Sequence, residues 1–532
     1  MSRFLFIIIV LLTVFSCTST KQFNAHIERE LSVKDQLKDL NFIERKLIKN
    51  HSKLDLYLSQ SEINFKFDSL RQRINVPLKP NDFFLKVNSV IAQFRHGHTD
   101  IYPLFKRISH KEEKRIKNST GPLSQLTTFW VNDSLYIINT SINDSLLKKG
   151  SVILAIDGIT PSQIKSKYQT VIYGDGFNTT YFNNRLNRSF FSQYYLLENG
   201  LKDTLQLSIY NKNEFKKLEI KRLFKSKEKK KLPAVKNKNQ LKVKSKPTEK
   251  PVQLKTFYFS LNKKTKTYSR ILSFPTNDST FAVLKINTFS FGKFKKDYQS
   301  IFKIIKDYNV KNLVLDLRNN GGGRLADANQ LFTYLQTDQI EFLGSQIVKS
   351  PSVMQRTMVN LSPTIVKPIM YPFSFISYLL INKSSTNEYQ IKPALSRIKN
   401  KYPRTVYQGN LYVIINGGSY SASTMIAANL QGLNRAYFVG EETGGDANGT
   451  VAGLIPTYKL PNSKLKLSIG TIYLTPNYYK TETIGRGIFP HKEIKTTLQD
   501  ALKNIDSQLR WIIQDVKEDN KALKEQLNYL PE

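Results

Sequence analysis

Three apolar segments in the second half of the chain each lead directly into a glycine-rich turn, and this arrangement constrains the fold most strongly. The segments are residues 312–317, residues 411–415 and the strand end at Val439-Gly440, and the turns are residues 321–323, 417–418 and 444–445. Residues 424–430, after the second turn, have the composition of a helix. Strands that alternate with helices are typical of an α/β domain. The pattern predicts such a domain over residues 253–515.

The second turn reads Asn-Gly-Gly-Ser-Tyr-Ser-Ala-Ser over residues 416–423. A turn between a strand and a helix lifts a side chain out of the sheet, and the N-terminus of the helix favours negative charge beside it. A serine in such a turn can attack a carbonyl carbon only when a base accepts its proton and N–H donors stabilise the oxyanion. Hydrogen bonding or helix capping is the alternative role for the serines of this turn.

Histidine is the side chain best suited to accept that proton near neutral pH. The chain has only six histidines, and two of them, His96 and His98, lie in the short segment 95–100. On chemistry alone, a lone histidine is more often structural than catalytic. Gly97 between them is expected to end a helix predicted over residues 80–94.

The N-terminus predicts export from the cytoplasm. Arg3 precedes an apolar run over residues 4–15, and Cys17, the only cysteine of the chain, follows at once. This resembles a bacterial lipoprotein signal, in which residues 1–16 are removed and Cys17 becomes lipidated. The alternative is an ordinary signal peptide with an incidental cysteine. We therefore expect a lipoprotein of the cell envelope that faces the periplasm from the inner or the outer membrane. A single cysteine excludes an intrachain disulfide and a multi-cysteine metal site, and we expect neither a metal nor a cofactor.

The first half of the chain is expected to contain two further regions. Apolar spacing predicts an N-terminal helical region over residues 17–115. Short β-like runs predict a β-rich domain over residues 120–221. Within it, residues 147–158 end in the turn Asp157-Gly158 and resemble the strand and turn of PDZ domains, which bind peptides at a sheet edge. A generic β-rich domain is the alternative.

The net charge of +38 does not by itself indicate nucleic-acid binding. Residues 221–250 contain 13 Lys or Arg but only two acidic residues, Glu228 and Glu249, and no recognisable nucleic-acid motif accompanies them. We expect a solvated linker over residues 222–252, near an anionic membrane surface, and no nucleic-acid partner. The sequence at the C-terminal end predicts an amphipathic helix over residues 505–527. This helix runs into a charged tail, which begins at residue 516 and continues to residue 532.

The three strand-turn segments, in this order and spacing, resemble the peptidase domain of the C-terminal processing, or tail-specific, serine protease family, which includes the tricorn-type proteases. The resemblance implies a crotonase-like or ClpP-like spiral core and hydrolysis of peptide bonds through an acyl-enzyme. It implies Ser421 as the nucleophile, with oxyanion donors at Ala422 and at Gly322, or alternatively Gly321. Asp316 and Arg318 are expected to pair and hold the glycine loop.

The base distinguishes two branches of this family. Many members use a Ser-Lys pair, but the position of that lysine corresponds here to Asp446, and no lysine occurs between Arg435 and Tyr458. The tricorn-type branch uses an upstream histidine, and Gly97-His98-Thr99 matches its Gly-His-Thr phrase. The resemblance therefore implies His98 as the base, with His96 as the alternative.

A third, orienting residue is not defined by the sequence. The family glutamate falls on Ile484, so Glu482 is the closest candidate, and Glu441, Glu442 and Asp446 are alternatives. The sequence predicts an exported, lipid-anchored serine endopeptidase that acts on polypeptides and recognises their C-termini through the PDZ-like region. A catalytically inactive peptide-binding lipoprotein of the same fold is the second hypothesis. An acyl-CoA enzyme of the crotonase-like fold is the third.

Overall fold

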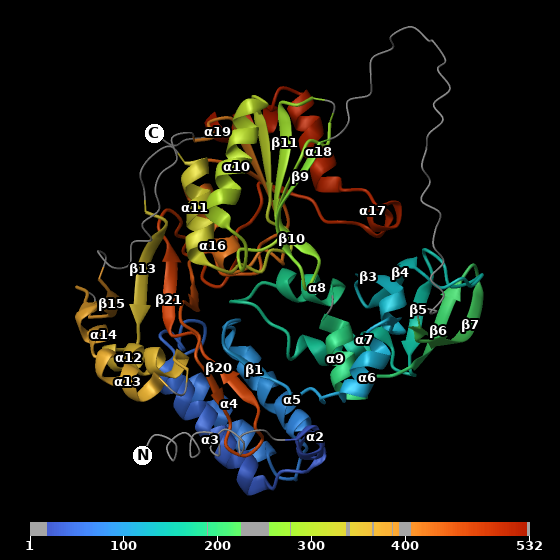
Figure 1. Cartoon of the computed structure of the whole chain (residues 1–532), viewed down its shortest axis with the longest axis vertical. Helices are drawn as coiled ribbons and strands as arrows, with labels where there is room; N and C mark the ends of the chain where they lie inside the picture. The colour runs from blue at the N-terminus through green and yellow to red at the C-terminus, as the bar shows by residue number, and fades with distance from the viewer. Residues whose placement is uncertain are drawn as a thin grey trace, which may run out of the picture.

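The computed structural model describes residues 19–188, 190–224, 255–276, 278–336, 341–363, 366–385, 387–392 and 406–528 (Figure 1). The expected signal peptide, Cys17 and most of the lysine-rich segment lie outside these residues. No helix within the described part of the chain is long and apolar enough to cross a bilayer.

The predicted α/β domain contains a seven-stranded sheet in the order β22-β17-β16-β12-β11-β10-β9. Its strands are β9 (Thr256–Asn262), β10 (Thr267–Ser273), β11 (Phe281–Ile286), β12 (Asn312–Asp316), β16 (Asn410–Ile415), β17 (Tyr437–Gly440) and β22 (Lys492–Glu493). The five strands from β11 to β22 are parallel, whereas β9 and β10 pair antiparallel. The three strands predicted from their apolar runs are therefore confirmed.

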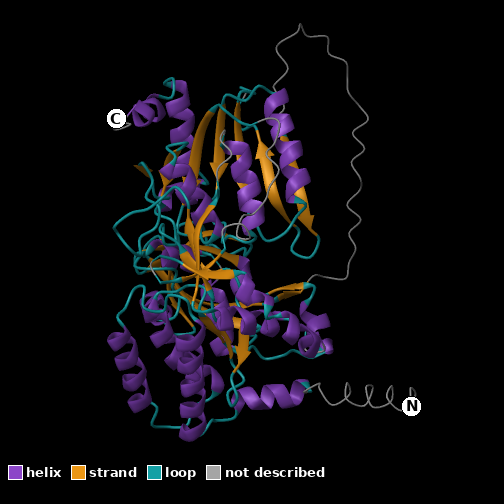
Figure 2. Cartoon of the chain, turned by 90° about the vertical axis from the view of Figure 1, so that its left-hand side faces the viewer, coloured by secondary structure: helices purple, strands orange, loops and turns teal. Residues whose placement is uncertain are grey.

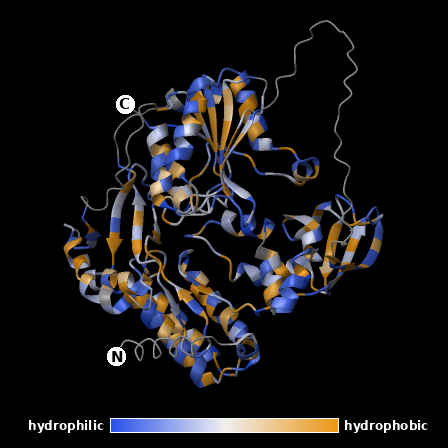
Figure 3. Ribbon diagram, viewed as in Figure 1, coloured by the Kyte–Doolittle hydropathy of each residue, from blue (hydrophilic) through white to orange (hydrophobic). Residues whose placement is uncertain are grey.

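Both faces of this sheet are covered by helices, which explains the continuous apolar runs of its strands. One face packs against α10 (Phe294–Asp307), α11 (Leu325–Leu335) and α16 (Ala422–Gly432). The other face packs against α18 (Ser507–Lys517) and α19 (Lys521–Asn528) through Ile512 and Leu523. Figure 3 shows apolar residues along the strands between these layers.

The C-terminal end differs from the single helix and free tail expected from sequence. The chain breaks between α18 and α19 at Asp519 and Asn520, which both have positive φ. The hydroxyl of Tyr412 donates to Asp515 and to Asn520, and this contact fixes the turn. Residues 521–528 thus pack on the sheet because Leu523 is apolar and buried, although their composition is largely charged.

A second sheet, in the order β14-β15-β13-β21-β18, adjoins the first one. Its strands are β13 (Leu343–Val348), β14 (Ile381–Lys383), β15 (Tyr389–Ile391), β18 (Thr450–Ala452) and β21 (Ile472–Pro476). The helices α12 (Pro351–Leu361), α13 (Lys367–Phe373) and α14 (Ile376–Leu379) lie beside it.

The N-terminal region folds into α2 (Thr20–Glu28), α3 (Val33–Asn50), α4 (Gln60–Arg73) and α5 (Pro80–Ile91), which is extended by a short 3-10 turn to Phe94. These helices share a core with a small sheet of β1 (Asp100–Tyr102), β19 (Thr457–Lys459) and β20 (Lys466–Ser468). They lie at the opposite end of the molecule from the seven-stranded sheet (Figures 1 and 2). The residue that ends the α5 segment is Arg95, with φ of 62°, and not Gly97 as predicted.

The part of the chain between β1 and β9 forms an antiparallel meander, with its strands in the order β3-β4-β5-β6-β7. Its strands are β3 (Leu126–Val131), β4 (Ser134–Thr140), β5 (Val152–Ile156), β6 (Thr204–Asn211) and β7 (Glu214–Lys221), and α6 (His110–Ile116), β2 (Ser119–Thr120), a 3-10 turn (Leu123–Gln125) and β8 (Leu223–Phe224) flank it. Between β5 and β6 lie α7 (Pro161–Gln169), α8 (Thr180–Asn187) and α9 (Phe190–Asn199), while α17 (Leu498–Lys503) precedes α18. Figure 1 shows α8 reaching from this region towards the glycine turns of the seven-stranded sheet.

Candidate active site

Ser421 lies at the junction between β16 and α16, as the residue that caps the helix. Its backbone has φ of 58° and ψ of −120°, and its side chain makes no capping hydrogen bond. A positive φ at a residue other than glycine costs roughly 1–3 kcal/mol and is concentrated at functional sites. The strained turn therefore directs the hydroxyl away from the helix, where another group can use it.

The group that meets this hydroxyl is His98, from the segment between α5 and β1. Its Nε2 lies 3.0 Å from Oγ of Ser421. Burial lowers the pKa of His98 to about 4, so its imidazole is neutral at neutral pH and able to accept a proton. His96 lies elsewhere: its Nε2 faces the carbonyl of Leu54 and its ring packs on His51.

The other nitrogen of His98 faces two hydroxyl groups. Nδ1 lies 3.0 Å from the Tyr420 hydroxyl and 3.0 Å from Oγ1 of Thr450. The Thr450 hydroxyl donates to the carboxylate of Asp175 at 2.9 Å, and the Tyr420 hydroxyl interacts with the same carboxylate. Hydroxyls that donate to Asp175 can accept from an Nδ1–H, which leaves the Nε2 lone pair towards Ser421. The two hydroxyls thus bridge His98 to an acid whose Oδ2 is 4.0 Å from Nδ1.

Asp175 is held in place by the backbone next to His98. The N–H of Gly97 donates to its Oδ1 at 2.9 Å. A Cβ on Gly97 would lie 2.4 Å from the Tyr420 hydroxyl, so glycine is needed for this approach. Burial raises the pKa of Asp175 to about 6.

The acids that the sequence suggested have other positions. Glu482 is exposed and makes no contact with His98 among the described hydrogen bonds and ion pairs. Glu442 pairs with Arg486 and accepts from the N–H of Gly487. Glu441 follows β17, and burial raises its pKa while Lys495 opposes this shift. The structure therefore places none of these three glutamates beside the histidine.

Asp446, at the position of the family lysine, also has a structural environment. It accepts hydrogen bonds from the Tyr57 hydroxyl at 2.8 Å and from the N–H of Gly485 at 3.0 Å. Burial raises its pKa to about 6. These contacts tie the N-terminal helical region to the loop after β21.

Sequence reasoning missed Asp175, Tyr420 and Thr450. The usable signals were weak: Asp175 lies between two glycines in Gly174-Asp175-Gly176, and Tyr420 immediately precedes Ser421. Thr450 carries no local signal, because only the pairing of β18 with β21 brings it to His98.

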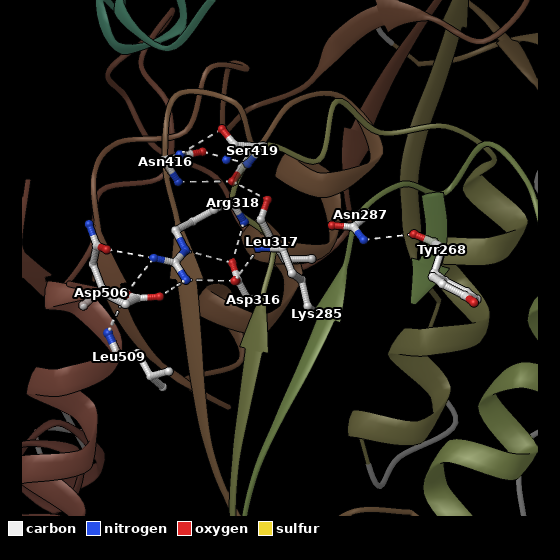
Figure 4. A network of polar contacts seen from close by, with 12 residues as sticks. Tyr268, Lys285, Asn287, Asp316, Leu317, Arg318, Asn416, Ser419, Asp506 and Leu509 are labelled. Carbon is white, nitrogen blue, oxygen red and sulfur yellow. Dashed lines mark hydrogen bonds and ion pairs between the residues drawn. The ribbon is translucent and has the colours of Figure 1, made fainter. Parts of the chain in front are cut away.

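The loop after β12 is fixed against the serine turn by a polar network (Figure 4). Arg318 makes two hydrogen bonds to Asp316, at 3.0 and 2.9 Å, and also binds Asp506. The predicted pairing of Asp316 with Arg318 is confirmed. Asn416 accepts from the N–H of Asn319 at 3.0 Å, which connects the two turns directly.

Gly322 packs directly on the serine turn, but its N–H is engaged. A Cβ on Gly322 would lie 2.8 Å from Cβ of Ser421, and its φ of 92° also requires glycine. Its N–H donates to Oδ1 of Asn320 at 3.0 Å. Gly321, in contrast, is exposed and lines the cavity beside His98. Gly321 and the N–H of Ala422, at the start of α16, are therefore the donors best placed to meet a ligand.

The other two serines of the turn are buried. The hydroxyl of Ser419 donates to the carbonyl of Leu317 at 2.8 Å, and the N–H of Asn416 donates to it. Ser423 is fully buried, and its hydroxyl has no described partner. Neither side chain contacts His98.

A cavity of about 400 Å³ opens beside the histidine. Its walls come from the glycine loop and serine turn on one side and from β1, α8 and α9 on the other. No cluster of three or more potential metal-ligating His, Cys, Asp or Glu side chains occurs among the described residues.

Part of the chain is similar to known peptidases. Residues 280–494 match the family model described as Peptidase family S41. A protein named carboxy-terminal-processing protease from Bartonella bacilliformis is 34% identical over 117 residues, which is 21% of this chain and 25% of the relative. The match thus spans only a quarter of that relative.

Two solved structures share the fold over nearly the whole chain. Mature CPAF complexed with lactacystin has a TM-score of 0.59 at 14% identity, covering 93% of this chain and 99% of its own. Mature CPAF alone has a TM-score of 0.57 at 14% identity, covering 94% and 99%. The likeness of residues 280–494 to Peptidase family S41 therefore supports a serine peptidase.

Proposed function

We propose that the chain is an active serine endopeptidase that uses Ser421 as nucleophile and His98 as general base. The observation that carries the proposal is the 3.0 Å contact between Oγ of Ser421 and Nε2 of His98. Asp175 acts as the orienting acid through the hydroxyls of Tyr420 and Thr450. On this proposal the enzyme belongs to the Ser-His branch, has a crotonase-like core, and gives Glu482 no catalytic role.

In the proposed reaction, Ser421 attacks the carbonyl carbon of a peptide bond while His98 accepts its proton at Nε2. The oxyanion receives hydrogen bonds from the N–H groups of Ala422 and Gly321. Gly322 can replace Gly321 as donor only if its N–H leaves Asn320. His98 then donates the proton to the leaving amine, and water hydrolyses the acyl-enzyme by the reverse sequence of proton transfers.

The location and the peptide-binding region belong to the same proposal. The lipoprotein-like signal supports a membrane anchor at Cys17 in the cell envelope. The five-stranded meander with α7 supports a PDZ-like region that presents substrate C-termini. The inactive, peptide-binding alternative predicts the same fold with an unreactive serine.

Reaction with a fluorophosphonate probe tests the proposed function. We expect covalent labelling of the wild-type chain, no labelling of Ser421→Ala, and labelling of Ser423→Ala at the wild-type rate. Ser423 is the matched control because it lies in the same turn and does not contact His98. An unlabelled wild-type chain that also fails to cut casein would contradict the peptidase function and favour the peptide-binding alternative.

The pH dependence of hydrolysis tests the role of Asp175. Because the pKa of Asp175 is about 6, kcat/KM should rise as the pH passes 6, when the ionised carboxylate begins to stabilise the imidazolium. In Asp175→Asn we expect this rise to disappear and kcat to fall by about 10²–10⁴-fold at pH 8. An unchanged pH profile in Asp175→Asn would remove this residue from the mechanism.

Asp175→Asn should also change how the free energy of unfolding depends on pH. The folded chain keeps the Asp175 proton between about pH 4 and 6, where the unfolded chain has lost it. The contribution of Asp175 to stability therefore falls as the pH rises through this window. Asp175→Asn should remove that part of the pH dependence of the unfolding free energy, measured by urea titration.

A further inference from the structure

The cavity beside His98 has one wall with two arginines. Arg185 lies on α8 and Arg188 at its C-terminal end, and both line the same cavity as His98, Gly321 and Tyr420. The cavity therefore contains the proposed nucleophile's base, a proposed oxyanion donor and two guanidinium groups. Its size, about 400 Å³, suits a short stretch of bound peptide.

The arginine wall is attached to the glycine loop itself. Nη1 of Arg188 donates to the carbonyl of Asn319 at 3.0 Å, and Nδ2 of Asn184 donates to Oδ1 of Asn319 at 2.8 Å. Asn319 is two residues from Gly321. A Cβ on Gly417 would lie 2.0 Å from the carbonyl oxygen of Thr180, so α8 also touches the serine turn. These contacts fix the position of the guanidinium groups relative to Ser421.

The charge of the cavity is positive near neutral pH. Burial lowers the pKa of Arg188, and the neighbouring Arg185 adds to this, but an arginine remains cationic in proteins. The acidic side chain in the lining is Asp100, whose pKa burial raises to about 7, so it is only partly ionised at that pH. Two cations thus face one partly neutral carboxyl group.

The rest of the wall is largely aromatic. Tyr102, Tyr181 and Tyr194 line the cavity, and the guanidinium carbon of Arg185 lies 5.3 Å from the centre of the Tyr181 ring. Aromatic walls exclude water from a bound chain, and guanidinium groups in such surroundings bind carboxylates more strongly than in open solvent. A lysine or arginine of a substrate would be repelled by the same wall.

We propose that this cavity is a specificity pocket that binds a carboxylate of the polypeptide substrate near the scissile bond, through Arg185 and Arg188. The inference rests on the proposed peptidase function and adds a substrate class to it. The carboxylate is supplied by an aspartate or glutamate side chain or by the free C-terminus of the substrate. Both sources present the same planar acceptor to the arginines, and the experiment below separates them.

Cleavage of a proteome-derived peptide library, followed by mass spectrometry, tests the pocket. The wild-type chain should enrich Asp and Glu near the cut bond, or cut preferentially near free C-termini. The double variant Arg185→Gln/Arg188→Gln should lose this preference, and Arg510→Gln, which changes an exposed arginine of α18 away from the cavity, should retain it. Synthetic peptides made with a C-terminal carboxamide and intact Asp and Glu side chains separate the sources, because this change abolishes only a preference for the terminal carboxylate.

Matched peptides then measure how strongly the pocket prefers a carboxylate. For one cut sequence, a peptide with Glu should have a kcat/KM about 10–100-fold above that of its Gln counterpart, and the double variant should reduce this ratio to about 1. For a C-terminal preference, the free acid and the amide take the places of Glu and Gln. A purely structural role of the arginines would lower the kcat/KM of both peptides equally and leave the ratio unchanged, which would overturn the pocket.

Labelling of Ser421 by the small, neutral fluorophosphonate distinguishes a failure of the specificity pocket from a failure of the peptidase function. A labelled chain that cuts the library without any preference for carboxylates contradicts the pocket and leaves the peptidase function intact. A chain that is neither labelled nor able to cut contradicts the proposed function, and the pocket fails with it.

Discussion

Ser421→Ala is expected to lower kcat for peptide hydrolysis on the order of 10⁶-fold, the scale at which a serine protease loses its nucleophile. His98→Ala should have an effect of similar size, because the hydroxyl is unreactive without the base 3.0 Å away. The double variant should be no slower than either single variant, since both residues serve one step. Single-turnover assays with a fluorogenic peptide would measure all three rates.

The same variants should remain folded. Ser421 makes no side-chain capping bond, so its hydroxyl contributes little to the stability of α16. We expect the melting temperature of Ser421→Ala to stay within a few degrees of wild type, because the change removes only the contact with His98. Residual hydrolysis above about 1% of the wild-type rate in purified Ser421→Ala would assign the reaction to another residue.

Arg270→Met is expected to destabilise the chain by about 3–5 kcal/mol, because it removes the cation of Asp297 and leaves the buried Asp327 only its pair with Arg324, at 3.3 Å. Arg270, on β10, is fully buried and binds Asp327 of α11 with both oxygens of that carboxylate. It also donates to Asp297 of α10 at 2.9 Å, and the Tyr298 hydroxyl donates to Asp327 at 2.8 Å. Urea unfolding followed by circular dichroism would measure the loss.

A second variant separates the missing cation from lost packing. In Arg270→Met/Asp327→Leu the buried charge of Asp327 is removed and only Asp297 keeps a carboxylate without its arginine, so part of the lost stability should return. A double variant as unstable as Arg270→Met would show that the shape of the arginine, and not its charge, holds β10 to α10 and α11.

The layered domain could be predicted because its signals are local. The strands β11, β12, β16 and β17 are short apolar runs, because parallel strands buried on both faces require them. Likewise, Asp157 and Gly158 were expected to turn the chain, and both have positive φ. The break between α18 and α19 was missed because its cause, the hydroxyl of Tyr412, lies about 100 residues earlier.

The catalytic site likewise contains residues that the local sequence predicts and residues that it does not. The strand-turn-helix around Ser421 is visible in a few consecutive residues, and the phrase around His98 required comparison with a family. The acid could not be predicted, because Asp175 reaches His98 only through the side chains of two other residues, one of them Thr450, 275 residues further along. Glu482 was chosen by proximity to a family position, and proximity in sequence carried no information about the direction of its side chain.

The distance along the chain between His98 and Ser421, 323 residues, has a consequence for biosynthesis. The ribosome makes the base first, the acid next, and the nucleophile only after most of the chain has emerged. No partial product that ends before Ser421 contains a complete catalytic group, and a product that ends before Thr450 lacks one of the bridges to Asp175. Proteolytic competence therefore arrives late in synthesis, so that a chain released before Ser421 is unable to cut other proteins.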